Sequence, residues 1–518
     1  MTWLEILRSR TLIIPMLVIF IALLVQTSWV DDDAFITLRT ADNLVHGYGP
    51  RWNVDERVQP FTNPLWMFLL AGVYTISGNG LLTLMFLAII VSALAVFLLL
   101  LKIPQNSFGL LLGFGILVLS KAFVDYSSSG LENPATHLIL VVFAILYLQA
   151  GNPIQGRRLF VLSLLAGLAA FNRMDTILFY IPVLLSALWQ QRSQKTFKLI
   201  LAGMSPFILW EIFSLVYYGF VFPNTYYAKL HTGIPTADII AQGFLYFINS
   251  LAWDPITLTI IISAVGMTFI GASQKEKFLA LGICLYLGYV ISIGGDFMSG
   301  RFFTAALVLS VILLIRRAED SPLLERWVWI SLILVLGILL APIKSYSNPL
   351  ESVTITFDNT TGVADERLGY YRYTNMLLIT RGMNLILRPG EDLARNNPGN
   401  GKIVVQDTGI GMLGFYGGPR VHIIDVLALA DPLLARLPVS DIKDWRIAHF
   451  ERNVPDGYVE TIESDENKFV DPDLAKYYDN LHVIISGDLW TTRRWEAIWK
   501  MNTGQYDDLL DSYLQTQK

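Results

Sequence analysis

The sequence is poor in charge and has almost no cysteine. Only 16% of its 518 residues are charged, against about 25% in soluble domains. This is too little charge to cover a soluble protein of this length, whereas helices that face lipid need none. The single cysteine, Cys284, excludes an intrachain disulfide and argues against a thiolate metal site. The net charge of -5 gives no basic surface, so no nucleic-acid partner is expected.

Long apolar stretches are abundant in the first two thirds of the chain. The first runs from Thr11 to about Val30, which is long enough to cross about 30 Å of hydrocarbon. Trp29 and three aspartates follow it directly, so we expect a retained helix rather than a cleaved signal peptide. About 11–12 such segments precede Ile343, and the composition becomes that of a soluble protein after Lys344.

These features predict a polytopic α-helical membrane module at residues 1–343 and a soluble α/β domain at residues 344–518. In the second domain we expect strands at Lys402–Val405, Val421–Val426 and Val483–Ser486, with a helix at Gly411–Tyr416.

Lysine and arginine in short loops predict the orientation of the chain, because such loops favour the cytoplasm. The basic clusters are Arg8 with Arg10, Arg157 with Arg158, Arg192 with Lys195 and Lys198, Lys275 with Lys277, and Arg316 with Arg317. A cytoplasmic N-terminus then places the loop at residues 31–63 and the C-terminal domain outside. Three apolar segments lie between that loop and the next predicted outer loop, at Asp125–Pro134, where an even number of crossings is required. We expect Pro64–Ser77 to be re-entrant or broken, with Phe108–Phe123 as the alternative.

Three consecutive aspartates, Asp31, Asp32 and Asp33, follow the first apolar stretch. They repel one another and face the negative end of the helix dipole, so stability alone does not favour them. A helix over Asp32–His46 would place Asp32 and Arg39 on one face and form an apolar stripe on another. We expect this helix to lie along the membrane surface. A solvated acidic loop is the alternative.

Further polar residues lie at the ends of apolar segments on the same predicted outer face. Ionisable groups at membrane depth are costly and indicate function by default, although each could instead form a structural ion pair. The cations are Arg39, Arg173, Lys229 and Arg301, and the carboxylates are Asp32, Asp33, Glu132, Asp175 and Asp296. Such a set suits an anionic substrate headgroup and leaves carboxylates for proton transfer.

The order of these motifs resembles the type C (GT-C) glycosyltransferases. The motifs are Asp32-Asp33-Ala34-Phe35-Ile36, Arg39, Thr62-Asn63-Pro64-Leu65-Trp66, Ser129-Gly130-Leu131-Glu132, Arg173-Met174-Asp175, Pro223-Asn224-Thr225-Tyr226-Tyr227-Ala228-Lys229 and Gly295-Asp296 with Arg301. Within that superfamily the later motifs, and the stretch from Gly411 to Pro432, resemble the terminal arabinofuranosyltransferases of the actinobacterial cell wall. The resemblance extends from Asp32 to about His449.

The resemblance implies transfer of a sugar, arabinofuranose by preference, from a polyprenyl-phosphate donor. The acceptor would be a glycan or protein outside the inner membrane of a bacterium. It implies Asp32, with Asp33 beside it, as the base toward the acceptor hydroxyl. We expect Arg39, Arg173, Lys229 and Arg301 at the donor phosphate. The residues expected to bind or orient substrate are Glu132, Asp175, Asn224, Tyr226, Tyr227 and Asp296.

The sequence departs from the family pattern at two places. Asp31 adds a third carboxylate, and Pro60-Phe61 stands where glycine with an aromatic residue is more usual. The sequence establishes no cofactor. A divalent cation (Mg²⁺, Mn²⁺ or Ca²⁺) held by Asp31, Asp32 and Asp33 is an alternative use of the acidic cluster.

Two other functions fit a polytopic chain of this composition. A transporter or flippase of a lipid-linked sugar predicts ionisable residues near the bilayer midplane and often inverted repeats, and the sequence suggests neither. A non-catalytic envelope assembly factor would use the soluble domain and leave the outer-face residues degenerate, which the charged set argues against.

Overall fold

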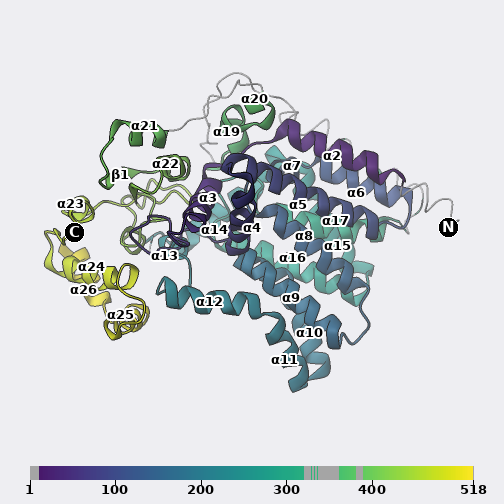
Figure 1. Cartoon of the computed structure of the whole chain (residues 1–518). Coiled ribbons are helices and arrows are strands. Elements are labelled where there is room, and N and C mark those ends of the chain that lie inside the picture. The colour runs from purple at the N-terminus through teal and green to yellow at the C-terminus, as the bar shows by residue number, and fades with distance from the viewer. Residues whose placement is uncertain are drawn as a thin grey trace. The chain divides into compact units, whose positions relative to one another are not determined.

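The computed structural model describes residues 11–230, 232–319, 361–380 and 389–516, together with positions 322, 328, 329, 332 and 335. These residues are mostly helical (Figure 1). The chain forms two compact units, each assembled from separate stretches. Unit 1 comprises Met1–Asp31, Leu81–Phe207 and Pro235–Ile386, and unit 2 comprises Asp32–Gly80, Ile208–Ile234 and Leu387–Lys518.

Several predictions fall outside the described residues. They are the boundary at residue 343, the start of an apolar segment near Trp327, and the basic pair Arg8 and Arg10. The division at residue 343 therefore stays a prediction.

The described part of unit 1 is built from helices. Its elements are α2 (Ile13–Thr27), α5 (Gly80–Lys102), α6 (Ser107–Leu119), α7 (Lys121–Tyr126), α8 (Asn133–Leu148), α9 (Gly156–Asn172), η1 (Met174–Phe179), α10 (Ile181–Gln191), α11 (Gln194–Gly203), α14 (Thr236–Trp253), α15 (Pro255–Gly271), α16 (Gln274–Ser292), α17 (Phe303–Ala318), α19 (Glu366–Thr374) and α20 (Met376–Thr380). Proline in the first turn of α8, α10 and α15 fits the helix start, where its missing N–H costs nothing.

One described helix, α5, is by itself long and apolar enough to cross a membrane, with 23 residues and a mean hydropathy of 3.1. Three sharply bent helix pairs raise the number of described spans to four if each pair is one span. In one of them, α14 and α15 meet at 112°. Helix α5 supports the prediction of an integral membrane protein. The expected 11–12 spans stay a prediction.

The two segments predicted as candidates for a broken span are both short helices. Pro64–Ser77 forms the 14-residue helix α4. Phe108–Phe123 is interrupted at Ser120, where α6 ends and the serine hydroxyl caps α7 by accepting from the Phe123 N–H. Which of these two segments fails to cross the membrane stays a prediction.

Unit 2 combines helices with a small parallel sheet. Its elements are α3 (Asp32–Val45), α4 (Pro64–Ser77), most of α12 (Ser205–Tyr217), α13 (Asn224–Leu230), α21 (Pro389–Asn396), β1 (Ile403–Asp407), α22 (Ile410–Gly417), β2 (Val421–Asp425), η4 (Leu434–Arg436), α23 (Tyr458–Ser464), α24 (Pro472–Ile485), α25 (Thr492–Asn502) and α26 (Asp507–Thr516).

The sheet forms a β1–α22–β2 crossover, made of the two strands and the helix that the sequence predicts for the first part of the tail. Ile403 pairs with Val421 and Asp407 with Asp425, in parallel register. The predicted helix at Asp32–His46 is also present as α3, which packs against α4 and α22. It is buried on more than the predicted stripe, because its polar residues Arg39 and Asn43 are buried along with Leu38 and Ala41.

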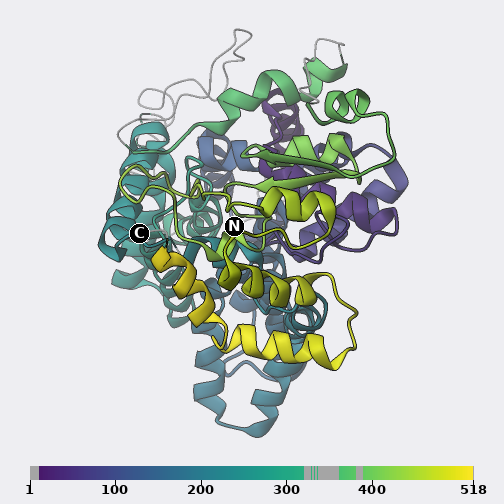
Figure 2. The same cartoon turned by 90° about the vertical axis from the view of Figure 1, so that its left-hand side faces the viewer.

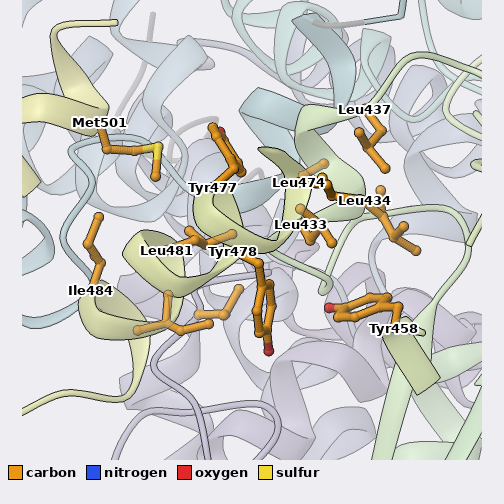
Figure 3. Packing of buried hydrophobic residues seen from close by; sticks show 14 of the residues in the cluster. Leu433, Leu434, Leu437, Tyr458, Leu474, Tyr477, Tyr478, Leu481, Ile484 and Met501 are labelled. Carbon is orange, nitrogen blue, oxygen red and sulfur yellow. The ribbon is translucent and has the colours of Figure 1, made fainter. Parts of the chain in front are cut away.

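The C-terminal helices pack around a hydrophobic core within unit 2 (Figure 3). Leu474, Tyr477 and Leu481 of α24 are buried there with Leu433 and Leu434. Figure 2 shows α24, α25 and α26 in yellow-green to yellow. The expected strand at Val483–Ser486 is wrong, since this stretch ends α24. Asp471 caps that helix, Pro472 begins it, and its buried residues recur at helical spacing, so the short β-branched run was a misleading signal.

Candidate active site

Two arginines in unit 1 share one buried glutamate. Glu132 precedes α8, Arg173 lies between α9 and η1, and Arg301 precedes α17. Glu132 Oε1 lies 2.6 Å from Arg173 Nη1 and 3.1 Å from Arg301 Nη2. Arg301 is 169 residues from Glu132 in sequence, so folding alone brings them together.

Two aspartates complete this group, which we name the Glu132 cluster (Glu132, Arg173, Asp175, Asp296 and Arg301). Arg173 Nε lies 2.9 and 3.0 Å from the two carboxylate oxygens of Asp175. Arg301 Nη1 lies 3.5 Å from Asp296 Oδ2. Five predicted site residues are therefore adjacent, and the three carboxylates and two guanidinium groups leave a net charge of -1.

An aromatic ring and two asparagine side chains hold the cluster in place. The Arg173 guanidinium lies 4.5 Å from the ring centre of Phe302. Asn172 Nδ2 donates to Thr136 Oγ1 at 2.9 Å, and Asn133 Nδ2 donates to Thr304 Oγ1 at 2.9 Å. Burial alone would raise the pKa of Glu132, but Arg301 and Arg173 lower it to about 2. Glu132 is therefore a fixed anion that orients two cations.

Asp32, in unit 2, is held by backbone groups instead of by arginine. Its Oδ2 accepts from the Gly411 N–H at 2.9 Å, and its Oδ1 accepts from the Met412 N–H at 2.7 Å. Both donors belong to the first turn of α22, whose N-terminal N–H groups have no partner within the helix. Burial raises the pKa of Asp32, and the Met412 and Gly411 N–H groups oppose that rise.

Gly411 is required by this close approach. A Cβ atom there would lie 1.9 Å from the Asp32 carbonyl oxygen and 2.9 Å from its Oδ2. Only a residue without a side chain lets α22 approach α3 so closely.

A metal site at Asp31, Asp32 and Asp33 stays a prediction, because these residues divide between the two units. Among the described residues, no group of three or more His, Cys, Asp or Glu side chains is arranged to hold a metal ion. Both oxygens of Asp32 already face N–H donors, which compete with a cation. Asp33 is partly buried in the same first turn of α3, and the Asp31 N–H donates to the Ser129 carbonyl at 3.2 Å.

Arg39 is buried among neighbouring residues within unit 2. Its Nη2 donates to the Val421 carbonyl at 2.5 Å, and its guanidinium lies 4.3 Å from the ring centre of Trp52. Burial lowers the pKa of Arg39 to about 9. The side chain is 1% exposed, so a phosphate reaches it only if neighbouring residues move.

Helix α13 carries the remaining predicted residues. Asn224 Nδ2 donates to the carbonyls of Ala428 and Asp431 at 3.0 and 2.9 Å, which fixes the loop after β2. Asn224 and Tyr227 also line a small pocket within unit 2. Tyr226 and Lys229 are exposed.

The structure thus gathers the predicted residues into separate groups inside each unit. The Glu132 cluster belongs to unit 1, whereas Asp32, Asp33, Arg39, Asn224, Tyr226, Tyr227 and Lys229 belong to unit 2. The convergence of Asp32 with the arginines of unit 1 in one pocket stays a prediction.

The sequence prediction missed the donors that hold Asp32, and it missed a pair in unit 2 formed by buried His422 and exposed Asp55. Gly409 and Gly411, placed between a strand and a helix, were a signal for a helix N-terminus that holds an anion. His422 on β2 lies 2.9 Å from Asp55 Oδ1 through its Nδ1 atom. Nothing local in the sequence pairs two residues that lie 367 positions apart.

Comparison with known proteins identifies relatives along most of the chain. It is 26% identical to a terminal β-(1→2)-arabinofuranosyltransferase of Mycobacterium tuberculosis, over 83% of this chain and 82% of that protein. It is 24% identical to the protein of the same name from Corynebacterium glutamicum, over 81% of this chain and 72% of that protein. No family model matches the chain.

A solved structure of ArnT from Cupriavidus metallidurans bound to undecaprenyl phosphate aligns with a TM-score of 0.44 and 12% identity, over 81% of this chain and 76% of that one. A likeness of that size is too weak to assign a fold. The two sequence relatives confirm the resemblance predicted from the motifs, and they confirm the glycosyltransferase class.

Proposed function

We propose that this protein is a GT-C membrane glycosyltransferase that moves arabinofuranose from a polyprenyl-phosphate donor to a glycan or protein acceptor. The reaction would take place on the extracytoplasmic face of a bacterial inner membrane. The observation that carries the proposal is the similarity to two arabinofuranosyltransferases over more than four fifths of the chain.

The reaction needs a base for the acceptor hydroxyl, and Asp32 is our candidate. Its carboxylate takes the hydroxyl proton while the acceptor oxygen attacks the anomeric carbon, and the bond to the donor phosphate breaks with its electron pair. The N–H groups of Gly411 and Met412 fix both carboxylate oxygens and leave each a further lone pair. Positioned general-base assistance is worth roughly two to four powers of ten in rate. Asp33, in the same turn, is the alternative base.

The departing phosphate needs cations, and we assign Arg173 and Arg301 to it, with Lys229 and Arg39 as further candidates. Glu132 fixes both unit 1 arginines before substrate arrives, which is the arrangement that electrostatic stabilisation requires. Because the Glu132 cluster carries a net charge of -1, attraction of an anion depends on the more exposed guanidinium, that of Arg173. Asp175 and Asp296 orient the arginines, and Asn224, Tyr226 and Tyr227 contact substrate in our proposal.

The test is a transfer assay with the purified full chain in proteoliposomes. A polyprenyl-phosphate arabinofuranose donor and a short arabinofuranose oligosaccharide acceptor should give an elongated oligosaccharide and free polyprenyl phosphate in equal amounts. Counterflow of labelled lipid-linked sugar with no covalent product would contradict the proposal and favour a flippase. A polyprenyl-phosphate mannose donor tests the choice of sugar in the same vesicles.

A further inference from the structure

Helix α25 of unit 2 exposes tryptophan, the residue type with the largest side chain. Trp499 is 67% exposed on α25, and Trp490, two residues before that helix, is 76% exposed. Tryptophan is usually highly buried, so two such indoles in one short segment indicate a binding surface.

The two exposed indoles are linked by a third. The rings of Trp490 and Trp495 are 6.4 Å apart between centroids, with 30° between their planes. Trp495 and Trp499 are four residues apart on α25, so they lie on one helix face, separated by about 6 Å along the axis. Trp490, Trp495 and Trp499 therefore form a row, which we name the tryptophan row.

The row rests on a rigid base. Trp495 is half-buried and packs against the core of the C-terminal helices. Arg494 is buried beneath it and donates to the carbonyls of Ile484, Val216 and Tyr217 at 2.8–2.9 Å. Asn502 fixes the other end of α25 by donating to the Gly219 carbonyl at 2.9 Å. A surface held in this way loses little entropy when a ligand binds.

Charged groups lie beside the indoles, which argues against burial in hydrocarbon. Glu496 and Lys500 form a 2.6 Å ion pair next to Trp499, and Arg493 is exposed six residues before it. Transfer of these charges into the bilayer core would be costly. Indole faces flanked by hydrogen-bonding groups suit a carbohydrate, because its C–H faces stack on the rings while its hydroxyls bond to the charged groups.

We propose that the tryptophan row is a carbohydrate-binding surface for a linear stretch of the acceptor glycan. The spacing along α25 matches successive sugar rings, so the row would hold two or three of them. The choice of an acceptor glycan rests on the proposed glycosyltransferase function, whereas the binding of a carbohydrate rests on the row alone.

Binding is tested with the full chain in detergent micelles. The probes are linear arabinofuranose and mannose oligosaccharides of increasing length, and calorimetry measures affinity. The double variant Trp490→Ala with Trp499→Ala should bind the longer oligosaccharides at least tenfold more weakly than the unaltered protein. Val470→Ala, at an apolar side chain that is 77% exposed outside the row, is the matched control and should change nothing.

Several outcomes would overturn the proposal. The first is that the double variant binds the oligosaccharides as tightly as the unaltered protein. The second is that the unaltered protein binds no oligosaccharide. The third is that the double variant keeps oligosaccharide binding but no longer binds phosphatidylglycerol vesicles. The last outcome would identify a membrane-interface anchor.

Kinetics separate this proposal from the one it rests on. In the transfer assay the double variant should raise KM for long acceptors and leave kcat unchanged for the shortest acceptor. A protein that binds oligosaccharide through the row but never transfers a sugar would contradict the proposed function and leave the carbohydrate surface standing. A double variant with unchanged KM for long acceptors would contradict the row as an acceptor site.

Discussion

Two buried glutamates, one in each unit, have opposite surroundings. Glu132 contacts two guanidinium groups, and its pKa falls to about 2. Glu56 accepts a hydrogen bond from Asn53 at 2.8 Å, and burial raises its pKa above the usual 4.5. Asp32 resembles Glu56 in this respect, since it accepts hydrogen bonds from two backbone N–H groups and its pKa is also raised.

This difference in partners gives the carboxylates different roles. A carboxylate that is ion-paired to arginine stays ionised and positions positive charge. A carboxylate held by neutral donors in a poorly solvated place exchanges a proton more readily near neutral pH, as a general base must. The Glu132 cluster is therefore suited to electrostatic work, and Asp32 to proton transfer.

Removal of Glu132 should have the largest effect on stability. Glu132→Ala leaves two largely buried guanidinium groups without their shared partner, and breaking such a pair costs about 3–5 kcal/mol. Urea unfolding of the purified protein in detergent measures the loss. Asp392→Ala removes an exposed ion pair with Arg395 and should change stability by about 0.5 kcal/mol or less. Equal stability of the two variants would show that Glu132 does not pair with the two arginines as described.

Substitution of Gly411 should have the next largest effect. Gly411→Ala introduces a methyl group 1.9 Å from the Asp32 carbonyl oxygen, and relief of such overpacking costs about 1–3 kcal/mol. We expect kcat for transfer to fall about 10- to 100-fold. Displaced Gly411 and Met412 N–H groups no longer lower the pKa of Asp32, so the acidic limb of the pH–rate profile should move to higher pH.

Gly409→Ala is the control for this substitution. It lies two residues earlier in the same turn, where an added Cβ meets its nearest neighbour, Asp407 Oδ1, at 3.7 Å. This variant should keep both kcat and the acidic limb. If Gly411→Ala lowers kcat without moving the limb, α22 stabilises the fold but does not tune the base.

Glu56 should contribute a pH dependence of stability, which is a separate test of the comparison. Since its folded pKa is raised, the stability that neutral Glu56 contributes is complete below pH 4.5 and is lost as pH rises through the folded pKa. The loss is about 1.4 kcal/mol for each unit by which the pKa is raised. Glu56→Gln, which keeps an acceptor oxygen for Asn53, should flatten this decline in thermal unfolding measured across that range. Parallel curves for the two proteins would contradict the raised pKa.

Local signals in the sequence predicted part of this architecture. The start of α3 at Asp32, the strands β1 and β2 and the helix between them follow from short patterns within a few residues. Val483–Ser486 failed because four residues cannot distinguish a strand from the end of a buried helix.

Local sequence patterns did not predict which residues contact the site residues. The sequence indicated Glu132, Arg173 and Arg301 as functional candidates, but their mutual contacts depend on helices far apart in the chain. Asp32 and Gly411 are 379 residues apart, so nothing local in the sequence showed that this helix N-terminus holds the proposed base.

The most direct measurement of the central claim compares transfer rates of Asp32→Asn and Asp33→Asn in the same proteoliposomes. Asparagine keeps the size of the side chain and removes its basicity. The account predicts that Asp32→Asn stays folded and loses roughly two to four powers of ten in kcat, while Asp33→Asn keeps most of its activity. Some thermal stability is lost as well, because the asparagine Nδ2 group cannot accept one of the two N–H bonds from α22. Full activity of a folded Asp32→Asn protein would contradict it.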